Sequence, residues 1–416
     1  MGKGRWHRKR LYWVIRGLMA LMFVITILLL NFNRLPPSTV TVSQEIRGVW
    51  LTNVNSGVFF IPWAINRALN QLSQLQFNTV YPVVWNRGTT FYKSTVAQRV
   101  TGQFQDDLLN LMRCGRDILS EIVREGHRKN LRIIPWFEYG FMAPIDSNVV
   151  RYHPDWVTLP KSESLKPISS QTELLKEVME NTPFFGIHNV WLNPLHPRVQ
   201  KFIQDLILEV VIKYDIDGIQ LDDHFAMPVN LGYDWYTVKL YRQEHKGKSP
   251  PDDPYNPDWM RWRADKLTAF MITLSQEIKA VKPDCLISLS PNPKHIAYRD
   301  YLQDWETWVN QGLIGELVVQ VYRDSQLSFI AEINHPSLKK IRQKIPVHIG
   351  ILTGLLGKTV DISTIQEQVE AVRDRGFNGI SFFYWESLWS YLTPDAPQQR
   401  RRIFKQLMSA GQKSEV

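Results

Sequence analysis

The sequence predicts an α/β fold, a (β/α)8 TIM barrel, preceded by one N-terminal transmembrane or signal helix. Two observations predict the barrel. Short β-rich runs alternate with helical segments eight times after residue 44, and the links that follow strands are longer than those that follow helices. An apolar run behind a basic head predicts the helix at the N-terminus. Strands that alternate with helices form a parallel sheet, and eight such units close into a barrel.

The segments are recognised by β-branched and aromatic runs, which alternate with stretches where apolar residues recur at helical spacing. The predicted strands span 46–53, 79–85, 131–138, 216–223, 285–292, 316–322, 347–353 and 379–386. The predicted helices span 63–75, 116–129, 197–214, 259–281, 301–311, 327–342, 362–375 and 398–408.

The links between these segments have the lengths that are typical of barrel enzymes. One helix-to-strand link is Asp215 alone, whereas three strand-to-helix links are long, covering 86–115, 139–196 and 224–258. Barrel enzymes carry their sites on the strand-to-helix loops. Three successive long loops would therefore wall a cleft for an extended polymer. We interpret the interior of 139–196 as a flap or a subsite wall.

The first 34 residues have the layout of an export signal. A basic head precedes an apolar run over 17–30, and residues 11–30 together approach the roughly 20 residues that span a bilayer. Neither a small-x-small cleavage site nor a Cys follows the run. We therefore predict an uncleaved signal-anchor, with a cleaved signal peptide as the alternative. The positive head would stay in the cytoplasm, which places the barrel outside it.

The net charge of +9 does not indicate a nucleic-acid partner. Residues 1–34 contribute +7, which leaves only +2 for the rest of the chain, too little for a face that follows a phosphate backbone. Cys114 and Cys285 lie far apart without a CxxC pair, so two unpaired thiols are expected. No obligate protein partner is expected. The predicted organisation is 1–34 as basic N-terminus and signal-anchor helix, 35–44 as linker, 45–410 as barrel and 411–416 as polar tail.

Carboxylates stand at the ends of three predicted strands. Asp222 and Asp223 end the fourth strand, Glu138 ends the third and Glu386 ends the eighth. Glycoside hydrolysis needs two carboxyl groups, one protonated as acid and one ionised as nucleophile or base. We predict Asp222 as nucleophile or base, Glu138 as general acid and Glu386 as the alternative acid. Asp223 would tune Asp222 or bind a sugar hydroxyl.

Aromatic and amide side chains accompany these carboxylates and are predicted to bind substrate. The chain has 15 Trp and 15 Tyr, and their flat apolar faces suit stacking on sugar rings, although large cores use them as well. The expected stacking platforms are Trp85, Trp136, Trp385 and Tyr322. The expected polar contacts are Asn53, Gln220, His224, Asn292 and Gln320.

A metal or a cofactor is not expected. Asp222, Asp223 and His224 offer oxygen and nitrogen ligands, but no HxxxH or HExxH pair accompanies them, and His188 and His196 are spaced wrongly for one helix face. The chain also lacks a GxSxG elbow, a GxGxxG loop and a Walker loop, which removes support for serine hydrolases, dinucleotide enzymes and kinases.

Four motifs resemble the bacterial glycosyl hydrolase-like 10 family over roughly residues 45–390. They are EIRGVWLTN at 45–53, NTVYPVVW at 78–85, YDIDGIQLDD at 214–223 and GISFFYWE at 379–386. The resemblance implies a glycosidase barrel that acts on bacterial polysaccharide, with cell-wall glycan as one case. The family commonly has an aromatic residue after the aspartate pair, where this chain has His224.

The sequence thus favours a membrane-anchored, extracytoplasmic glycoside hydrolase with a two-carboxylate mechanism. Two alternatives stay open. One is a non-catalytic glycan-binding barrel that tethers the membrane to the wall, and the other is a metal-dependent carbohydrate deacetylase on the same scaffold.

Overall fold

The computed structural model describes residues 45–163, 189–389 and 393–410. The predicted anchor at 11–30, the linker at 35–44, the tail at 411–416 and the central part of the predicted flap lie outside them. Within the described ranges, none of the helices combines the length and apolar character that crossing a membrane requires.

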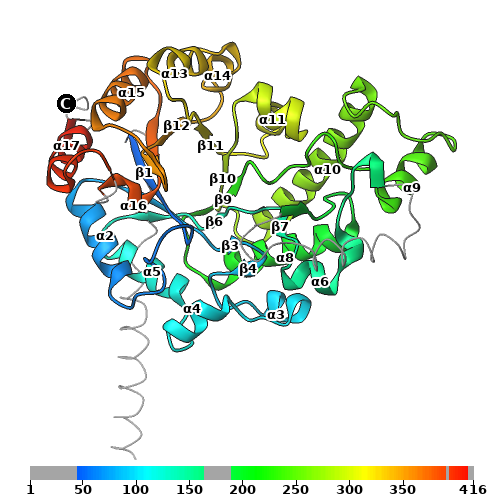
Figure 1. The fold of residues 1–416 in the computed structure, drawn as a ribbon, viewed down its shortest axis with the longest axis horizontal. Helices are drawn as coiled ribbons and strands as arrows, with labels where there is room; N and C mark the ends of the chain where they lie inside the picture. Colours follow the sequence, from blue (N-terminus) through cyan, green and yellow to red (C-terminus); the bar gives the residue numbers. More distant parts are fainter. Residues whose placement is uncertain (1–44, 164–188, 390–392, 411–416) are drawn as a thin grey trace, which may run out of the picture. The chain divides into compact units, whose positions relative to one another are not determined.

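The centre of the fold is a curled sheet in which all neighbouring strands pair in parallel (Figure 1). Its strand order is β5-β2-β1-β15-β12-β11-β10-β9-β6. The strands are β1 (Ile46–Leu51), β2 (Thr79–Pro82), β5 (Arg132–Ile133), β6 (Trp136–Phe137), β9 (Gly218–Asp222), β10 (Leu286–Ser290), β11 (Glu316–Gln320), β12 (Val347–Leu352) and β15 (Gly379–Phe383).

The two outer strands of this order, β5 and β6, are successive pieces of the predicted third strand. The Ile134 amide donates to the Val80 carbonyl at 3.0 Å, and the Gln220 amide donates to the Pro135 carbonyl at 2.8 Å. Val83 also bridges Trp136 in parallel. Residues 134–135, which separate β5 from β6, therefore form hydrogen bonds to β2 on one side and to β9 on the other. The resulting α/β architecture is TIM-like, as the alternation of strands and helices predicts.

Helices surround the sheet (Figure 1). Those that match predicted segments are α2 (Ala64–Gln74), α5 (Ile118–His127), α8 (Pro197–Lys213), α10 (Pro257–Val281), α12 (Trp305–Asn310), α13 (Gln326–Ile333), α15 (Ile362–Asp374) and α17 (Pro397–Ala410). Their apolar faces bury against one hydrophobic core that includes both faces of the strands.

Several predicted boundaries are wrong, among them those of two helices and of the eighth strand. The predicted helix 327–342 is split into α13 and α14 (Pro336–Ile341), because Pro336 has no amide hydrogen and cannot continue a helix. The predicted helix 301–311 begins later, since Leu302 adopts a left-handed conformation and separates α11 (Lys294–Tyr301) from α12. The eighth strand ends at Phe383, and Trp385 begins the short helix α16 (Trp385–Leu388).

The long loops contain structure of their own. The second loop carries the ribbon of β3 (Trp85–Asn86) and β4 (Thr89–Thr90), followed by α3 (Thr95–Thr101) and α4 (Asp107–Met112). The third carries α6 (Asn148–Tyr152) and the ribbon of β7 (Met142–Pro144) and β8 (Asn189–Trp191). The fourth carries α9 (Trp235–Glu244). A further ribbon, β13 (Gly354–Leu355) with β14 (Lys358–Thr359), follows β12. Cys114 and Cys285 are both free thiols.

A buried charged cluster lies inside the sheet around Glu316. This carboxylate is 3.3 Å from the Arg132 guanidinium and 3.4 Å from His348 Nε2, and it accepts a hydrogen bond from Ser288 Oγ at 2.9 Å. Burial acts to raise the pKa of Glu316, but His348, Arg132 and Ser288 outweigh it and lower the pKa to about 2. A depressed carboxyl pKa stabilises the fold above the unfolded value of about 4.5.

We expect Glu316→Gln to lower the free energy of unfolding by about 3 kcal/mol at pH 7, because the variant leaves Arg132 without its buried partner. The difference from wild type should shrink as the pH falls from 4.5 towards 2, where Glu316 becomes protonated in the folded protein. Denaturant unfolding at several pH values measures both effects. Glu370→Gln, at an exposed position of α15, is the matched control. An effect of the same size in both variants would contradict the prediction.

Candidate active site

The candidate site begins at the carboxyl end of β9. Side chains alternate along a strand, and Gln220 points into the sheet interior, where its amide oxygen accepts from Trp50 Nε1 at 2.7 Å. Asp222, two residues later, lies on the same side and is 2% exposed. The Phe225 amide then donates to the Asp222 carbonyl at 3.0 Å. The chain therefore turns directly after the strand, and this turn carries Asp223 and His224.

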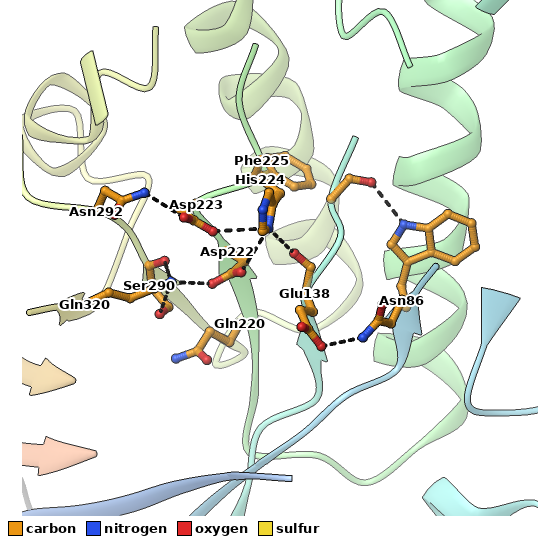
Figure 2. Close-up of polar contacts among 12 residues, drawn as sticks. Asn86, Glu138, Gln220, Asp222, Asp223, His224, Phe225, Ser290, Asn292 and Gln320 are labelled. Carbon is orange, nitrogen blue, oxygen red and sulfur yellow. Dashed lines mark hydrogen bonds and ion pairs between the residues drawn. The ribbon is translucent and has the colours of Figure 1, made fainter. Parts of the chain in front are cut away.

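One imidazole nitrogen links the third and fourth strand ends. His224 Nδ1 lies 3.0 Å from the Glu138 carbonyl, 3.2 Å from Asp223 Oδ1 and 3.4 Å from Asp222 Oδ2 (Figure 2). Because a carbonyl oxygen only accepts hydrogen bonds, Nδ1 carries the proton. Two amides complete the set: Gln320 Nε2 donates to Asp222 Oδ1 at 2.9 Å, and Asn292 Nδ2 donates to Asp223 Oδ2 at 2.6 Å.

Glu138 is buried beside this group, with 8% of its surface exposed. Its Oε2 accepts from Asn86 Nδ2 at 2.6 Å (Figure 2). The same oxygen accepts from Thr52 Oγ1 at 3.1 Å. Asn86 also donates to Asn53 Oδ1 at 2.8 Å. The ends of β1, β3 and the third strand therefore meet at Glu138 through side-chain hydrogen bonds.

Burial and neighbouring charges shift the pKa values of these groups. Burial raises the pKa of Glu138 to about 7, although the charge of His224 and the hydroxyl of Thr52 oppose the shift. Burial, followed by the charge of Asp223, raises the pKa of Asp222. Burial disfavours the charged form of His224, but Asp223 and Asp222 outweigh it and raise the imidazole pKa to about 10. At neutral pH His224 is therefore a cation between carboxyl groups.

Aromatic rings flank the imidazole. The ring centroid of Tyr139 is 5.9 Å from that of His224, and the ring of Trp191 in β8 is 6.0 Å away. Tyr322 packs on Phe383 at 5.6 Å between ring centroids. The negative charges of Asp222 and Asp223 contribute to the raised pKa of Tyr322, after burial, which places this phenol in the field of the aspartate pair.

The structure buries three of the predicted substrate contacts. Trp85 is fully buried, donates from Nε1 to the Gly140 carbonyl at 3.0 Å and packs against Phe202 of α8. Trp136 is 2% exposed and lies beneath the site against Trp50. Gln220 is fully buried, with its amide bonded to Trp50 and to Ser288. None of the three offers a free face to a sugar: Trp136 and Gln220 contact Trp50 inside the sheet, and Trp85 packs towards α8.

The remaining predicted contacts are partly exposed, as substrate binding requires. They are Asn53, His224, Asn292, Gln320, Tyr322 and Trp385. The amides of Asn292 and Gln320 hold the two aspartates. Trp385 packs edge-on against Trp389.

Glu386 stands apart from the aspartate pair. Its Oε1 accepts a hydrogen bond from Ser56 Oγ, and burial raises its pKa to about 8 although that hydrogen bond opposes the shift. Among the residues that the structure describes, no hydrogen bond or ion pair joins Glu386 to Asp222, Asp223 or Glu138. Glu138, in contrast, is joined to the aspartate pair through its backbone carbonyl, and the charges of His224 and Asp223 act on its carboxyl group.

Three residues in the contact network were missed at the level of sequence: Thr52, Asn86 and Ser290. Thr52 and Asn86 each adjoin a residue that was chosen, Asn53 and Trp85, and each ends a strand. Ser290 pairs with Asp222 in the strand register, and its Oγ and carbonyl accept from Gln320. Strand-end position was the usable signal for all three.

The same turn is the one place among the described residues where three metal-binding side chains gather. Ligand atoms of Asp222, Asp223 and His224 all lie within 4.8 Å of one another. Oxygen and imidazole ligands suit zinc and related ions. However, His224 Nδ1 carries a proton for the Glu138 carbonyl, so only Nε2 is left as a ligand. The hydrogen bonds present fit a carboxylate pair held by an imidazolium.

Comparison with known proteins assigns the chain to a family. A profile described as glycosyl hydrolase-like 10 matches residues 45–371. The chain belongs to the glycosyl hydrolase-like 10 family. It is 25% identical over 328 residues to the glycosyl hydrolase DigH of Escherichia coli K12, covering 69% of this chain and 67% of that protein. It is 25% identical over 320 residues to the glycosyl hydrolase YngK of Bacillus subtilis 168, covering 67% of this chain and 54% of the relative.

Solved structures share the fold of this family member. The glycoside hydrolase domain of PgaB (BpsB) from Bordetella bronchiseptica superposes with a TM-score of 0.60 at 12% identity, covering 86% of this chain and 98% of that domain. The catalytic domain of β-amylase from Paenibacillus polymyxa gives a TM-score of 0.57 at 11% identity, covering 89% and 100%. At such identities the likeness concerns the fold alone. With the family assignment, it supports a glycosidase-type enzyme.

The geometry predicts that His224 stays protonated through neutral pH and that Asp223→Asn lowers its pKa, because Asp223 supplies the nearest carboxylate charge. The imidazole resonances of histidine-labelled protein, followed against pH by NMR, measure this value. His224→Gln identifies the signal, and Asp265→Asn, at an exposed position of α10, is the matched control. A wild-type midpoint near the ordinary 6.5 would contradict the prediction.

Proposed function

We propose that this family member is a glycoside hydrolase that cleaves a bacterial polysaccharide with a two-carboxylate mechanism. The observation that carries the proposal is that the Glu138 backbone carbonyl and the Asp222 and Asp223 carboxylates meet one imidazolium, which brings Glu138 to the aspartate pair at the carboxyl ends of neighbouring strands. Glycosidases need two carboxyl groups whose environments keep one protonated and leave the other ionised.

Glu138 is the general acid in this proposal. A pKa of about 7 keeps a large fraction of the group protonated at neutral pH, so it can transfer its proton to the leaving glycosidic oxygen. Asp222 is the nucleophile or the base. Donors on both of its oxygens, Gln320 Nε2 and His224 Nδ1, favour its ionised form, and His224 thereby opposes the rise in the pKa of Asp222 that burial causes. Asp223 holds the charge of His224 or binds a sugar hydroxyl.

Glu386 stays the alternative acid in this proposal. Its pKa of about 8 keeps it protonated at neutral pH, but it lies in a separate contact group with Ser56. Tyr322 and Trp385 are the partly exposed rings proposed to stack on sugars. We further propose that residues 11–30 anchor the enzyme in the membrane with the barrel outside the cytoplasm. Glycan strands of the bacterial cell wall are then the first substrate to test.

We expect wild type to produce new reducing ends from cell-wall glycan strands or from one of a panel of β-glycans. Asp222→Asn should lower turnover by at least about a thousandfold, because the amide can act neither as nucleophile nor as base. Mass spectrometry of the fragments measures both proteins, with Asp300→Asn at a partly exposed position of α11 as the control.

Two other outcomes of this experiment would replace the proposal. Binding without cleavage by both wild type and Asp222→Asn would indicate the non-catalytic glycan-binding barrel. Loss of acetyl groups from the glycan, abolished by a chelator, would indicate the metal-dependent deacetylase. That second candidate is retained because of the Asp222–Asp223–His224 ligand set.

The pH dependence tests the role of Glu138. A general acid works only while protonated, so kcat/KM should fall tenfold per pH unit above about 7. The Thr52 hydroxyl lowers the pKa of Glu138, and Thr52→Val should therefore move this alkaline limb to higher pH. Thr52→Ser retains the hydroxyl and is the matched control. An alkaline limb that is unchanged in Thr52→Val but lost in Glu386→Gln would assign the acid to Glu386.

A further inference from the structure

The turn that carries Asp223 and His224 leaves backbone carbonyls without partners in the sheet. The carbonyls of Asp222, Asp223 and Phe225 all accept from one side-chain nitrogen, Gln303 Nε2, at 3.0, 3.4 and 3.2 Å. Gln303 is 1% exposed and lies 81 residues from Asp222 in the chain. The two hydrogens of a single buried amide are therefore shared among three acceptors of the turn, of which the Asp222 carbonyl also accepts from the Phe225 amide.

The backbone fixes the position of this amide. Gln303 lies between α11 and α12, directly after Leu302, which is fully buried and adopts a left-handed conformation with φ of 55°. The backbone N–H of Gln303 donates to the Ala297 carbonyl at 2.8 Å. Carbonyls at the end of α11 also hold the segment after the turn, since Tyr301 accepts from Met227 at 3.0 Å and Asp300 accepts from Val229 at 2.8 Å.

The opposite side of the turn contacts the loop after β6 at Gly140 and Phe141. The Phe141 amide donates to the His224 carbonyl at 3.1 Å. Gly140 has a φ of +49°, and a Cβ at this position would lie 2.6 Å from the same carbonyl oxygen. Only glycine permits this approach without a shift. The turn is therefore enclosed between the loop after β6 and the side chain of Gln303.

The chemistry of the three acceptors determines the residue type. The opposite orientation of the Gln303 amide would place its oxygen against three carbonyl oxygens, so the network requires the NH2 group at this position. A carboxylate would repel the same oxygens. An apolar side chain would remove the donor from the Asp223 and Phe225 carbonyls and leave the Asp222 carbonyl with the Phe225 amide.

We propose that Gln303 is a positioning residue for the candidate active site. It does not contact substrate; it holds the turn so that Asp222, Asp223 and His224 keep their mutual hydrogen bonds and their orientation towards Glu138. This role rests on the proposed glycosidase function. Displacing a catalytic group by about 1 Å can lower turnover about a hundredfold, and loss of the amide would permit such a displacement.

The first test compares Gln303→Met and Gln303→Glu with wild type in the full chain. Both variants nearly conserve the volume of the side chain but remove the NH2 group. We expect kcat to fall about 10- to 100-fold with KM changed less than threefold, and the alkaline limb assigned to Glu138 to shift. Gln204→Met is the matched control, because Gln204 is also buried, lies in α8 and has an Nε2 without a hydrogen-bond partner among the described residues. Wild-type kcat and pH profile in Gln303→Met would overturn the proposal.

A second measurement does not depend on activity. Hydrogen–deuterium exchange of the full chain, read by mass spectrometry, should show faster exchange in the peptide covering 222–229 for both Gln303 variants. The amides of Phe225, Met227 and Val229 report it, because they form the backbone bonds of the held segment. Faster exchange throughout the barrel would indicate general destabilisation and would contradict a local positioning role. If wild type cleaves no glycan but the local change appears, the turn is positioned as proposed and the glycosidase function fails.

Discussion

The site depends on one hydrogen-bond donor that serves three oxygens. His224 Nδ1 faces the backbone carbonyl of Glu138 and a carboxylate oxygen of each aspartate. Asp222 is buried and the adjacent Asp223 is partly buried, so the two carboxylates repel each other and lose solvation. The imidazolium offsets both costs, and its carbonyl contact ties the end of the third strand to the end of the fourth. The same contacts raise the pKa of the imidazole to about 10, so His224 stays a cation at neutral pH.

The surrounding structure explains why this donor can be held so closely. Gln303 and Asn292 both follow β10 in the chain. Gln303 donates to backbone carbonyls of the turn, and Asn292 donates to the Asp223 carboxylate. Gln320, at the end of β11, donates to the Asp222 carboxylate. Gly140 admits the turn against the neighbouring loop. Under it lies a layer of buried rings, with Trp50 in contact with both Trp136 and Phe383. This layer keeps water from below and so raises the pKa of Glu138 and Asp222 by burial.

Much of the fold follows from local pattern. Apolar residues recur where a strand or helix buries one face, so the spacing of these residues predicts the element. Every strand and helix of the eight predicted units has an observed counterpart. The errors occur where a single residue breaks the pattern, as at Leu302 and Pro336. The carboxyl groups of the site were predictable by a similarly local rule. Asp222, Asp223 and Glu138 were found because parallel strands bring their carboxyl ends to one face, and this rule needs no knowledge of side-chain direction.

The sequence by itself determined the family, the strand-helix alternation and the carboxylates at the strand ends, because these are properties of short segments. Tertiary structure alone decided which side chains are free to meet a substrate. Trp85 and Trp136 are aromatic residues of the type that stacks on sugars, yet packing buries both rings. Glu386 was predicted to end the eighth strand, but it lies in α16 and contacts Ser56. Gln303 shows the reverse case, since 81 residues separate it from the turn that it holds. Contacts of that kind arise only when the sheet curls, and no local pattern encodes which distant amide will meet three carbonyls.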